Sequence, residues 1–286
     1  MSNKNDALGN RMKTYENVTR NYLTRRMPVI IRLDGKSFHS FTRGFKKPFD
    51  DVLVDTMQQT MKYLCENIQG CVLGYTQSDE ITLVLVDYQN RDSCAWFGNN
   101  LQKMCSVSAS MATLAFNKFF SEQVQDFMYA CCDEFGDNVL PEKQNDYDNA
   151  VKVYFNKLNA AMFDSRVFTI PKEEVVNCLI WRQQDATRNS IQSVGQANFS
   201  HKQLLGKTCN DIQDMLMLEK GINWNDYPTH LKRGSCCIKK EELINVEKSA
   251  EEGIIFIATT RNKWVIDTEI PIFTQNKDYV NRLVMV

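Results

Sequence analysis

A short β-branched run that ends in an acidic residue constrains this chain more than any other feature. Residues 29–31 read Val-Ile-Ile and lead into Arg-Leu-Asp-Gly at 32–35. The hydrophobic run predicts a strand buried on both faces, and ligands gather at the carboxyl ends of such strands. We therefore expect Asp34 to lie at a functional site. The alternative is a turn that only closes a core strand, because Asp-Gly is among the commonest turn dipeptides.

A second candidate site residue, Asp79, lies 45 positions after Asp34. Two strand-like runs, 71–75 and 81–86, are joined by the short link 76–80, which predicts a hairpin with Asp79 at its tip. The interval leaves room for one crossover helix, so the hairpin can place Asp79 beside Asp34. Adjacent carboxylates repel unless a cation lies between them. A pair of Mg²⁺ ions that also holds substrate phosphates is the usual arrangement.

The apolar pattern predicts the elements around these strands. Helical spacing covers residues 12–26, 51–68, 91–120, 151–162 and 173–192, the first of them a packing helix, and a β-rich run covers 166–170. Residues 38–51 predict a loop whose basic side chains can meet phosphate. The order strand, helix, hairpin, helix, strand is a ferredoxin-like βαββαβ unit of the α+β class, which also forms the palm of nucleotide-polymerising enzymes and cyclases. We expect a palm-like catalytic domain over 1–240 with a helical insertion at about 121–162, and a C-terminal extension over 241–286 packed on the same domain.

Composition limits the partners. The net charge of −1 argues against a broadly basic nucleic-acid coat, so any RNA contact must be local. No apolar stretch reaches membrane length and the first residues are polar, so we expect a cytoplasmic protein without a membrane partner. The ten cysteines and three histidines lack the spacing of zinc sites, and we expect reduced thiols.

A set of ordered motifs between about residues 10 and 240 resembles the tRNA-histidine guanylyltransferase family. They read Arg-Leu-Asp-Gly-Lys-Ser-Phe-His at 32–39, Phe-Lys-Lys-Pro-Phe-Asp at 45–50, Gln-Ser-Asp-Glu at 77–80, Phe-Asp-Ser-Arg at 163–166 and Trp-Arg-Gln at 181–183. The resemblance implies a palm, two Mg²⁺ ions, and nucleotide addition to the 5′ end of tRNA. It also implies that ATP or GTP activates that end, that nucleoside triphosphates are substrates, and that the protein is a homotetramer.

The resemblance further implies roles for single residues. The metal ligands would be Asp34, the carbonyl of Gly35 and Asp79. The catalytic set would add Lys47, Ser78 and Glu80. Nucleotide-site candidates are Arg32, Lys36, Ser37, Phe38, His39 and Asp50. For RNA we expect contacts from Arg182, Arg188, Asn189, Lys232 and Arg233.

One stretch departs from the family pattern. Eukaryotic members that guanylate histidine tRNA carry His-Ile-Asn-Asn after the Trp-Arg-Gln motif, whereas residues 187–190 here read Thr-Arg-Asn-Ser. This resembles the bacterial, archaeal or viral guanylyltransferase-like branch, which implies template-dependent 3′-to-5′ addition that repairs 5′-truncated tRNA. The alternatives are a histidine-tRNA-specific enzyme that adds one G, a non-catalytic RNA-binding protein on a palm scaffold, and a nucleotide cyclase, which leaves the stretch 181–190 unexplained.

Overall fold

The computed structural model describes residues 6–135, 141–250 and 253–285, with side chains described outside 131–146 and 244–258. Its centre is a six-stranded sheet in the order β4-β1-β3-β2-β5-β6, in which every neighbouring pair is antiparallel. The strands are β1 (Val29–Gly35), β2 (Cys71–Gln77), β3 (Glu80–Leu85), β4 (Phe163–Thr169), β5 (Ser235–Ala250) and β6 (Gly253–Asp267). Helix α3 (Asp51–Asn67) joins β1 to β2, and α4 (Leu101–Phe135) lies between β3 and β4. The predicted βαββαβ unit is therefore confirmed.

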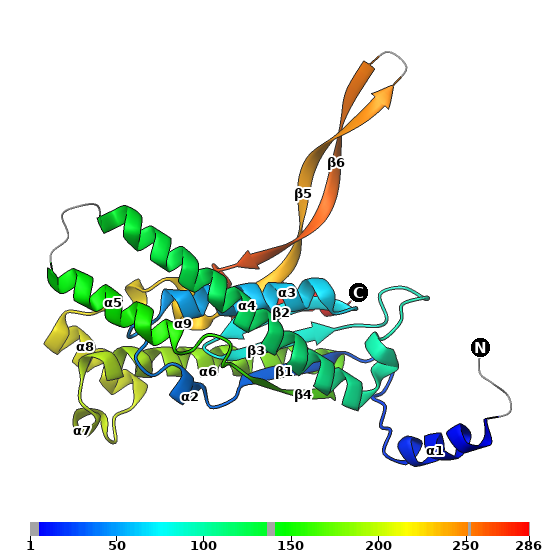
Figure 1. The fold of residues 1–286 in the computed structure, drawn as a ribbon, viewed down its shortest axis with the longest axis horizontal. Coiled ribbons are helices and arrows are strands. Elements are labelled where there is room, and N and C mark those ends of the chain that lie inside the picture. Colours follow the sequence, from blue (N-terminus) through cyan, green and yellow to red (C-terminus); the bar gives the residue numbers. More distant parts are fainter. Residues whose placement is uncertain (1–5, 136–140, 251–252, 286) are drawn as a thin grey trace.

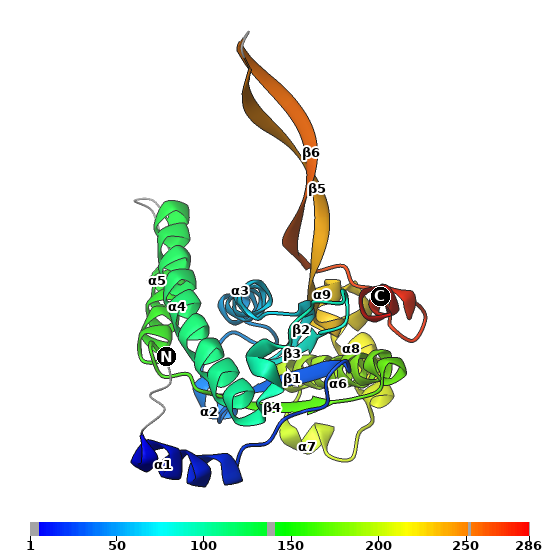
Figure 2. The ribbon, with the colours of Figure 1, turned by 90° about the vertical axis from the view of Figure 1, so that its right-hand side faces the viewer.

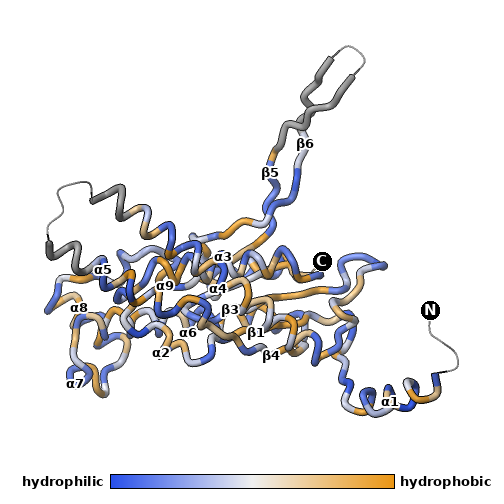
Figure 3. Tube along the Cα trace, viewed as in Figure 1, coloured by the Kyte–Doolittle hydropathy of each residue, from blue (hydrophilic) through white to orange (hydrophobic). Residues whose placement is uncertain are grey.

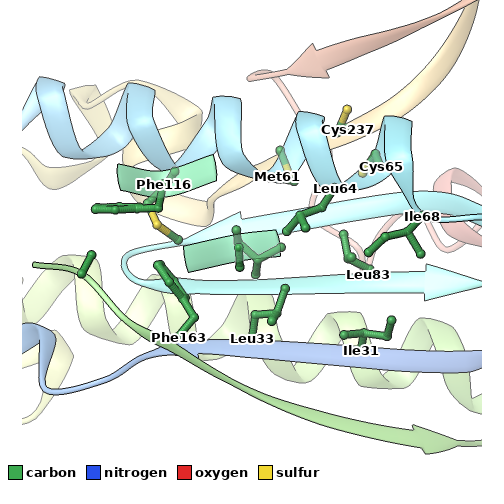
Figure 4. Packing of buried hydrophobic residues seen from close by; sticks show 14 of the residues in the cluster. Ile31, Leu33, Met61, Leu64, Cys65, Ile68, Leu83, Phe116, Phe163 and Cys237 are labelled. Atoms are coloured by element: carbon green, nitrogen blue, oxygen red, sulfur yellow. The ribbon is translucent and has the colours of Figure 1, made fainter. Parts of the chain in front are cut away.

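Helices cover both faces of the sheet (Figures 1 and 2). Residues 29, 31 and 33 of β1 pack in the core under α3 and α4, and Figure 4 shows Ile31, Leu33 and Leu83 below Met61 and Leu64 of α3. Ile30 packs in the opposite core, with α6 (Lys172–Asn198) and α10 (Asp278–Val284). Because side chains alternate along a strand, Arg32 and Asp34 lie on the same side as Ile30. This alternation assigns Asp34 to the face that α6 covers.

Shorter elements complete the described chain. They are α1 (Ala7–Val18), α2 (Phe38–Phe41), η1 (Trp96–Asn99), α5 (Pro141–Phe155), α7 (His201–Leu204), α8 (Cys209–Lys220), η2 (Trp224–Asp226) and α9 (Thr229–Arg233). The carboxyl half of α6 packs with α8 around Val194, Leu216 and Trp224. None of the helices in the described residues is both long and apolar enough to span a membrane.

Several local expectations were wrong. The packing helix expected over 12–26 is α1, which ends at Val18 and buries no residue; it lies apart from the body in Figure 1 and carries both hydrophobic and hydrophilic residues in Figure 3. The expected loop over 38–51 begins with α2. The helix expected over 151–162 is α5, which ends at Phe155.

The proposed domain limits cross regular elements. The expected insertion at about 121–162 starts inside α4, includes α5, and contains residues 136–140, which lie outside the described part. The expected boundary at residue 240 falls within β5, which pairs with β2 along its first residues and then continues with β6 as a projecting hairpin (Figures 1 and 2). The chain on either side of residue 240 therefore shares one sheet.

Candidate active site

The carboxyl end of β1 carries an acidic residue between two others. Asp34 lies opposite Glu80 of β3 and opposite Asp164 of β4 in the antiparallel register. Directly opposed residues of antiparallel strands point to the same face. The three carboxylates therefore form a row across the end of the sheet, on the face that α6 covers.

Arginines lie directly behind this acidic row. Arg32 precedes Asp34 by two residues and is opposite Arg166 of β4. The Nη2 atom of Arg166 lies 3.9 Å from Oδ2 of Asp34 and 3.7 Å from Oδ1 of Asp164. The pKa of Asp34 is nevertheless raised, first by burial and then by the charges of Glu80 and Asp164, while Arg166 and Arg32 oppose the shift. The site therefore has more negative charge than its arginines offset.

The hairpin between β2 and β3 brings Asp79 to this row. Its turn residue Ser78 has a positive φ of 49°, and the carbonyl of Asp79 accepts a hydrogen bond of 3.1 Å from the amide of Gly35. Burial raises the pKa of Asp79 to about 6, with a further contribution from the charge of Asp34. The hydroxyl of Ser78 donates to Oδ1 of Asp79 over 3.1 Å and favours the ionised form. The predicted pairing of the two acids by strand end and hairpin tip is present.

The donor set suits Mg²⁺. Carboxylates are the hard oxygen ligands that this ion prefers, and raised carboxylate pKa values mark a place where a cation would be stabilised. No group of three or more His, Cys, Asp or Glu side chains in the described residues could hold a metal by itself. In the usual Mg²⁺ site, one or two carboxylates are completed by water and substrate phosphates. Asp34 and Asp79 are the side chains that fit this role.

Glu80 is instead bound by two arginines. Its Oε1 atom lies 3.0 Å from Nη2 of Arg32, and its Oε2 atom lies 2.5 Å from Nη1 of Arg182. Arg182 is 4% exposed, and its Nη2 atom lies 3.4 Å from Oδ2 of Asp185. The guanidinium of Arg182 is therefore inside the protein, away from the surface that an RNA phosphate could reach. The paired Glu80 carboxylate fixes the hairpin directly beside the tip that carries Asp79.

A cavity of about 250 Å³ lies beside the hairpin tip. It is enclosed by the loop before α3, by α3 itself, by the end of β2, and by α6 and α9, and it collects candidates that lie far apart in sequence: Lys47, Asp50, Ser78, Asn189 and Lys232. Its wall includes polar groups, among them the amide of Gln58, which donates to the hydroxyl of Ser235 over 2.8 Å. Gln58 and Ser235 had no predicted role, because they face the cavity only once α3 packs beside β5.

Two residues that line the cavity, Asp50 and Lys232, form hydrogen bonds that stabilise the surrounding loops. The carboxylate of Asp50 caps α3 by accepting from the amide of Leu53 over 3.0 Å, and it also accepts from the amide of Lys46 over 2.9 Å and from the hydroxyl of Tyr154 over 2.8 Å. The Nζ atom of Lys232 donates to the carbonyl of Asn225 over 2.5 Å, and burial lowers the pKa of Lys232. Lys47 belongs to the same loop, is exposed, and lines the cavity.

The remaining candidates after β1 divide between core and surface. The ring of Phe38 is buried and packs against Phe41, Phe116 and Phe163 at centroid distances of 4.8, 5.4 and 5.2 Å. A Cβ atom on Gly35 would lie 2.3 Å from that ring, which explains the glycine. Lys36, Ser37 and His39 are exposed at the edge of the site.

The other RNA candidates occupy the α6 and α9 region. Arg188 is exposed and forms an ion pair with Asp185. Arg233 is half-buried, with its Cζ atom 5.6 Å from the ring centroid of Trp224. The structure also brings Asp164 and Arg166 to the site, although no role was predicted for them as members of the Phe-Asp-Ser-Arg motif. Their Asp-Ser-Arg alternation was the signal, because it directs both charges to one face of an edge strand.

Comparison with known proteins defines the class. A family model described as tRNAHis guanylyltransferase matches residues 9–171. The tRNA(His) guanylyltransferase of Saccharomyces cerevisiae is 24% identical over 242 residues, which cover 80% of this chain and 89% of that protein. The probable tRNA(His) guanylyltransferase of Dictyostelium discoideum is 26% identical over 225 residues, which cover 74% of this chain and 75% of that protein. The palm-type fold and the matched sequence define a nucleotidyltransferase.

Solved structures agree with this class. A bacterial tRNA(His) guanylyltransferase-like protein in complex with ATP is 41% identical with a TM-score of 0.76, and the match covers 97% of this chain and 99% of that one. A bacterial tRNA(His) guanylyltransferase-like protein in complex with GTP is 38% identical with a TM-score of 0.71, covering 98% and 100%. The chain therefore belongs to the tRNAHis guanylyltransferase family. Its activity is guanylyltransferase-like nucleotide addition.

Proposed function

We propose that this enzyme adds nucleotides to the 5′ end of truncated tRNA in the 3′-to-5′ direction, with the opposing strand as template. The observation that carries the proposal is the 3.1 Å bond between the Gly35 amide and the Asp79 carbonyl, because it joins two acid-bearing strand ends beside a cavity. The likeness to bacterial proteins in complex with ATP and GTP supports a nucleoside triphosphate as a ligand of this enzyme.

We propose two Mg²⁺ ions held by Asp34, Asp79 and the carbonyl of Gly35. Bound there, Mg²⁺ would lower the pKa of an attacking hydroxyl and offset the charge of departing pyrophosphate. The protein's own contribution is position and charge. The Glu80 ion pairs fix the hairpin, and Ser78 donates to the Asp79 carboxylate, so the acids are in place before substrate binds.

We assign Lys47 to the triphosphate that activates the 5′ phosphate. Lys47 is exposed on a loop that is held by hydrogen bonds from the amides of Lys46 and Leu53 to the carboxylate of Asp50. A lysine in this position can neutralise phosphate charge. The reaction then needs two displacements. First, the 5′ phosphate attacks the α-phosphorus of ATP or GTP and displaces pyrophosphate; next, the 3′ hydroxyl of an incoming nucleotide attacks the activated 5′ phosphorus and displaces AMP or GMP.

We infer template dependence from residues 187–190, which stand where eukaryotic members have a histidine-containing run. Residues 187–190 lie on α6, where Asn189 and Ser190 line the cavity and the side chain of Arg188 is exposed. Without that run, pairing with the opposing base can select the nucleotide, since base pairing needs no protein contact to every base edge. We also propose that the enzyme works as a homotetramer in the cytoplasm; family resemblance supports the assembly, and a tRNA substrate supports the location.

One assay tests the proposal. Metal-dependent transfer of label from α-labelled nucleotides is measured on tRNAs that lack the first 5′ nucleotide and on full-length histidine tRNA. We expect addition of whichever nucleotide complements the opposing base. Strong preference for G on full-length histidine tRNA, opposite a base that cannot pair with it, would replace the repair function with dedicated guanylylation.

A further inference from the structure

Trp181 differs from the other tryptophans of the chain in its exposure. The chain has 4 tryptophans; Trp96 and Trp224 are 8% and 5% exposed, and Trp264 is half-buried. Trp181 is 50% exposed although it lies on α6, directly beside the buried Arg182. A large aromatic surface left open to solvent next to a catalytic site calls for an explanation.

The exposed ring is held rigidly from within the protein. The Cζ atom of Arg182 lies 3.8 Å from its centroid, and the Cζ atom of Arg32 lies 4.9 Å from it. Both guanidinium groups are fixed by the carboxylate of Glu80. The indole therefore rests on two immobilised cations, so a ligand that stacks on it would meet a surface already in place.

The ring also lies one side-chain layer from the acidic row. Arg32 contacts the ring, precedes Asp34 by two residues, and shares its face of the sheet. Arg166, opposite Arg32, belongs to β4, which is the last strand on that side of the sheet, and its side chain is 58% exposed. The surface beside Asp34 thus combines an open indole with an exposed guanidinium.

We propose that Trp181 is a stacking platform for an unpaired nucleobase of the RNA substrate. This inference rests on the proposed function, which puts the 5′ end of a tRNA acceptor stem at Asp34 and Asp79. In such a stem the 3′ strand continues past the last base pair as single-stranded nucleotides. Their bases have open faces, and recognition of unpaired RNA relies on aromatic side chains and arginine planes. The occupant is therefore the unpaired 3′ extension next to the reacting end.

A purely structural role is the competing explanation, in which the indole only shields the ion pairs of Glu80. The two roles predict different effects on different RNA substrates. A shield affects the fold and every RNA alike, whereas a platform affects only RNA with unpaired bases beside the duplex end.

The experiment measures binding without catalysis. Two 5′-phosphorylated RNA duplexes, one with a four-nucleotide 3′ extension and one blunt, are titrated without nucleoside triphosphate against wild type, Trp181→Phe and Trp181→Leu. Stacking on an aromatic side chain predicts that W181L loses about 10-fold in affinity for the extended duplex and keeps its affinity for the blunt one. We expect W181F to retain most of the preference. Trp264→Phe, on β6, serves as the control.

Intrinsic fluorescence gives a second readout that does not depend on the leucine variant being folded. The extended duplex should quench tryptophan emission in wild type and in W264F, and W181F should lose that quenching. Equal losses on both duplexes, or unchanged quenching in W181F, would overturn the platform. Failure to bind either duplex would overturn the RNA substrate itself and the platform with it. Binding without a preference for the extended duplex would overturn the platform alone.

Discussion

The Nη1 atom of Arg182 lies 2.5 Å from Oε2 of Glu80, across 102 positions of sequence. The contact joins α6 to the first residue of β3, immediately after the hairpin tip that carries Asp79. Arg32 binds the other oxygen of the same carboxylate over 3.0 Å. Both carboxylate oxygens of Glu80 are thereby paired with arginines and hold the hairpin. They are therefore not available to a metal ion in the way that those of Asp34 and Asp79 are.

Arg182→Ala should destabilise the enzyme, because it removes one of the two arginines paired with the Glu80 carboxylate, leaves that carboxylate with Arg32 and the amide of Gln77, and empties a buried position. Breaking one partner of a buried ion pair costs about 3–5 kcal/mol, and we expect a loss near the lower limit because Glu80 is 20% exposed. Urea unfolding measures the change. Arg188→Ala is the matched control, since Arg188 also pairs with Asp185 but its side chain is 59% exposed; it should cost less than about 1 kcal/mol. Equal effects of the two substitutions would contradict the anchoring role of Arg182.

Asp34→Ala and Asp79→Ala should each abolish nucleotide addition while the protein stays folded. Both substitutions remove a carboxylate whose pKa is raised by burial and by neighbouring negative charge, and relief of that repulsion does not weaken the fold. Label transfer with and without EDTA measures the activity, and circular dichroism reports the fold. Asp214→Ala on the exposed face of α8 should behave as wild type. Metal-dependent turnover in either folded variant would rule out the ligand assignment.

The raised pKa of Asp79, about 6 against an ordinary 3.8, also sets a pH dependence. Between about pH 4 and pH 6 the folded protein keeps a proton on Asp79 that the unfolded chain has released. The unfolded state binds fewer protons there, so the stability of the metal-free enzyme falls as pH rises through this window. Urea unfolding in EDTA at pH 4.5 and pH 7 should show the decrease. Asp79→Asn should reduce it, and an unchanged decrease in that variant would place its origin in other groups.

The sequence predicted the parts of the site that local pattern determines. Asp34 follows a β-branched run and Asp79 lies at a hairpin tip, and both placements depend only on short-range alternation and turn length. Side-chain direction was harder to predict. Arg182 was expected to bind RNA and Phe38 to bind the nucleotide, but both side chains point inward. Their partners in the structure, Glu80 and Phe116, are 102 and 78 residues away in the sequence, so a local pattern does not reveal them. Helical spacing over residues 12–26 predicts an apolar stripe without saying what covers it, and α1 buries no residue.

Lys47→Ala should weaken activation of a 5′-monophosphate more than later steps. Lys47 is exposed beside the cavity, and loss of its charge removes a group that can neutralise the activating triphosphate. A tRNA that already carries a 5′ triphosphate should recover most of the activity in single-turnover assays. Lys46→Ala is the matched control, because Lys46 is adjacent but forms an ion pair with Asp51 over 2.7 Å. Equal impairment on monophosphorylated and triphosphorylated tRNA would show that Lys47 acts in a step common to both substrates rather than in activation.

Substrate choice should follow the template rather than the identity of the tRNA. Residues 187–190 place an amide and hydroxyls along α6, with Asn189 and Ser190 at the cavity, and no histidine occupies this stretch. Truncated tRNAs of several identities, each offered the four triphosphates separately, should therefore accept the nucleotide that complements the opposing base.

The exposed Arg188 offers a phosphate contact that carries no sequence information, in contrast to the buried Arg182. Arg188→Ala should lower the affinity for every truncated tRNA by a similar factor and reduce the slope of log affinity against log salt by about 1. The complementary nucleotide should still be preferred. If Arg188→Ala instead changes which nucleotide is added, the protein itself reads the base at this position, and selection by pairing alone is wrong.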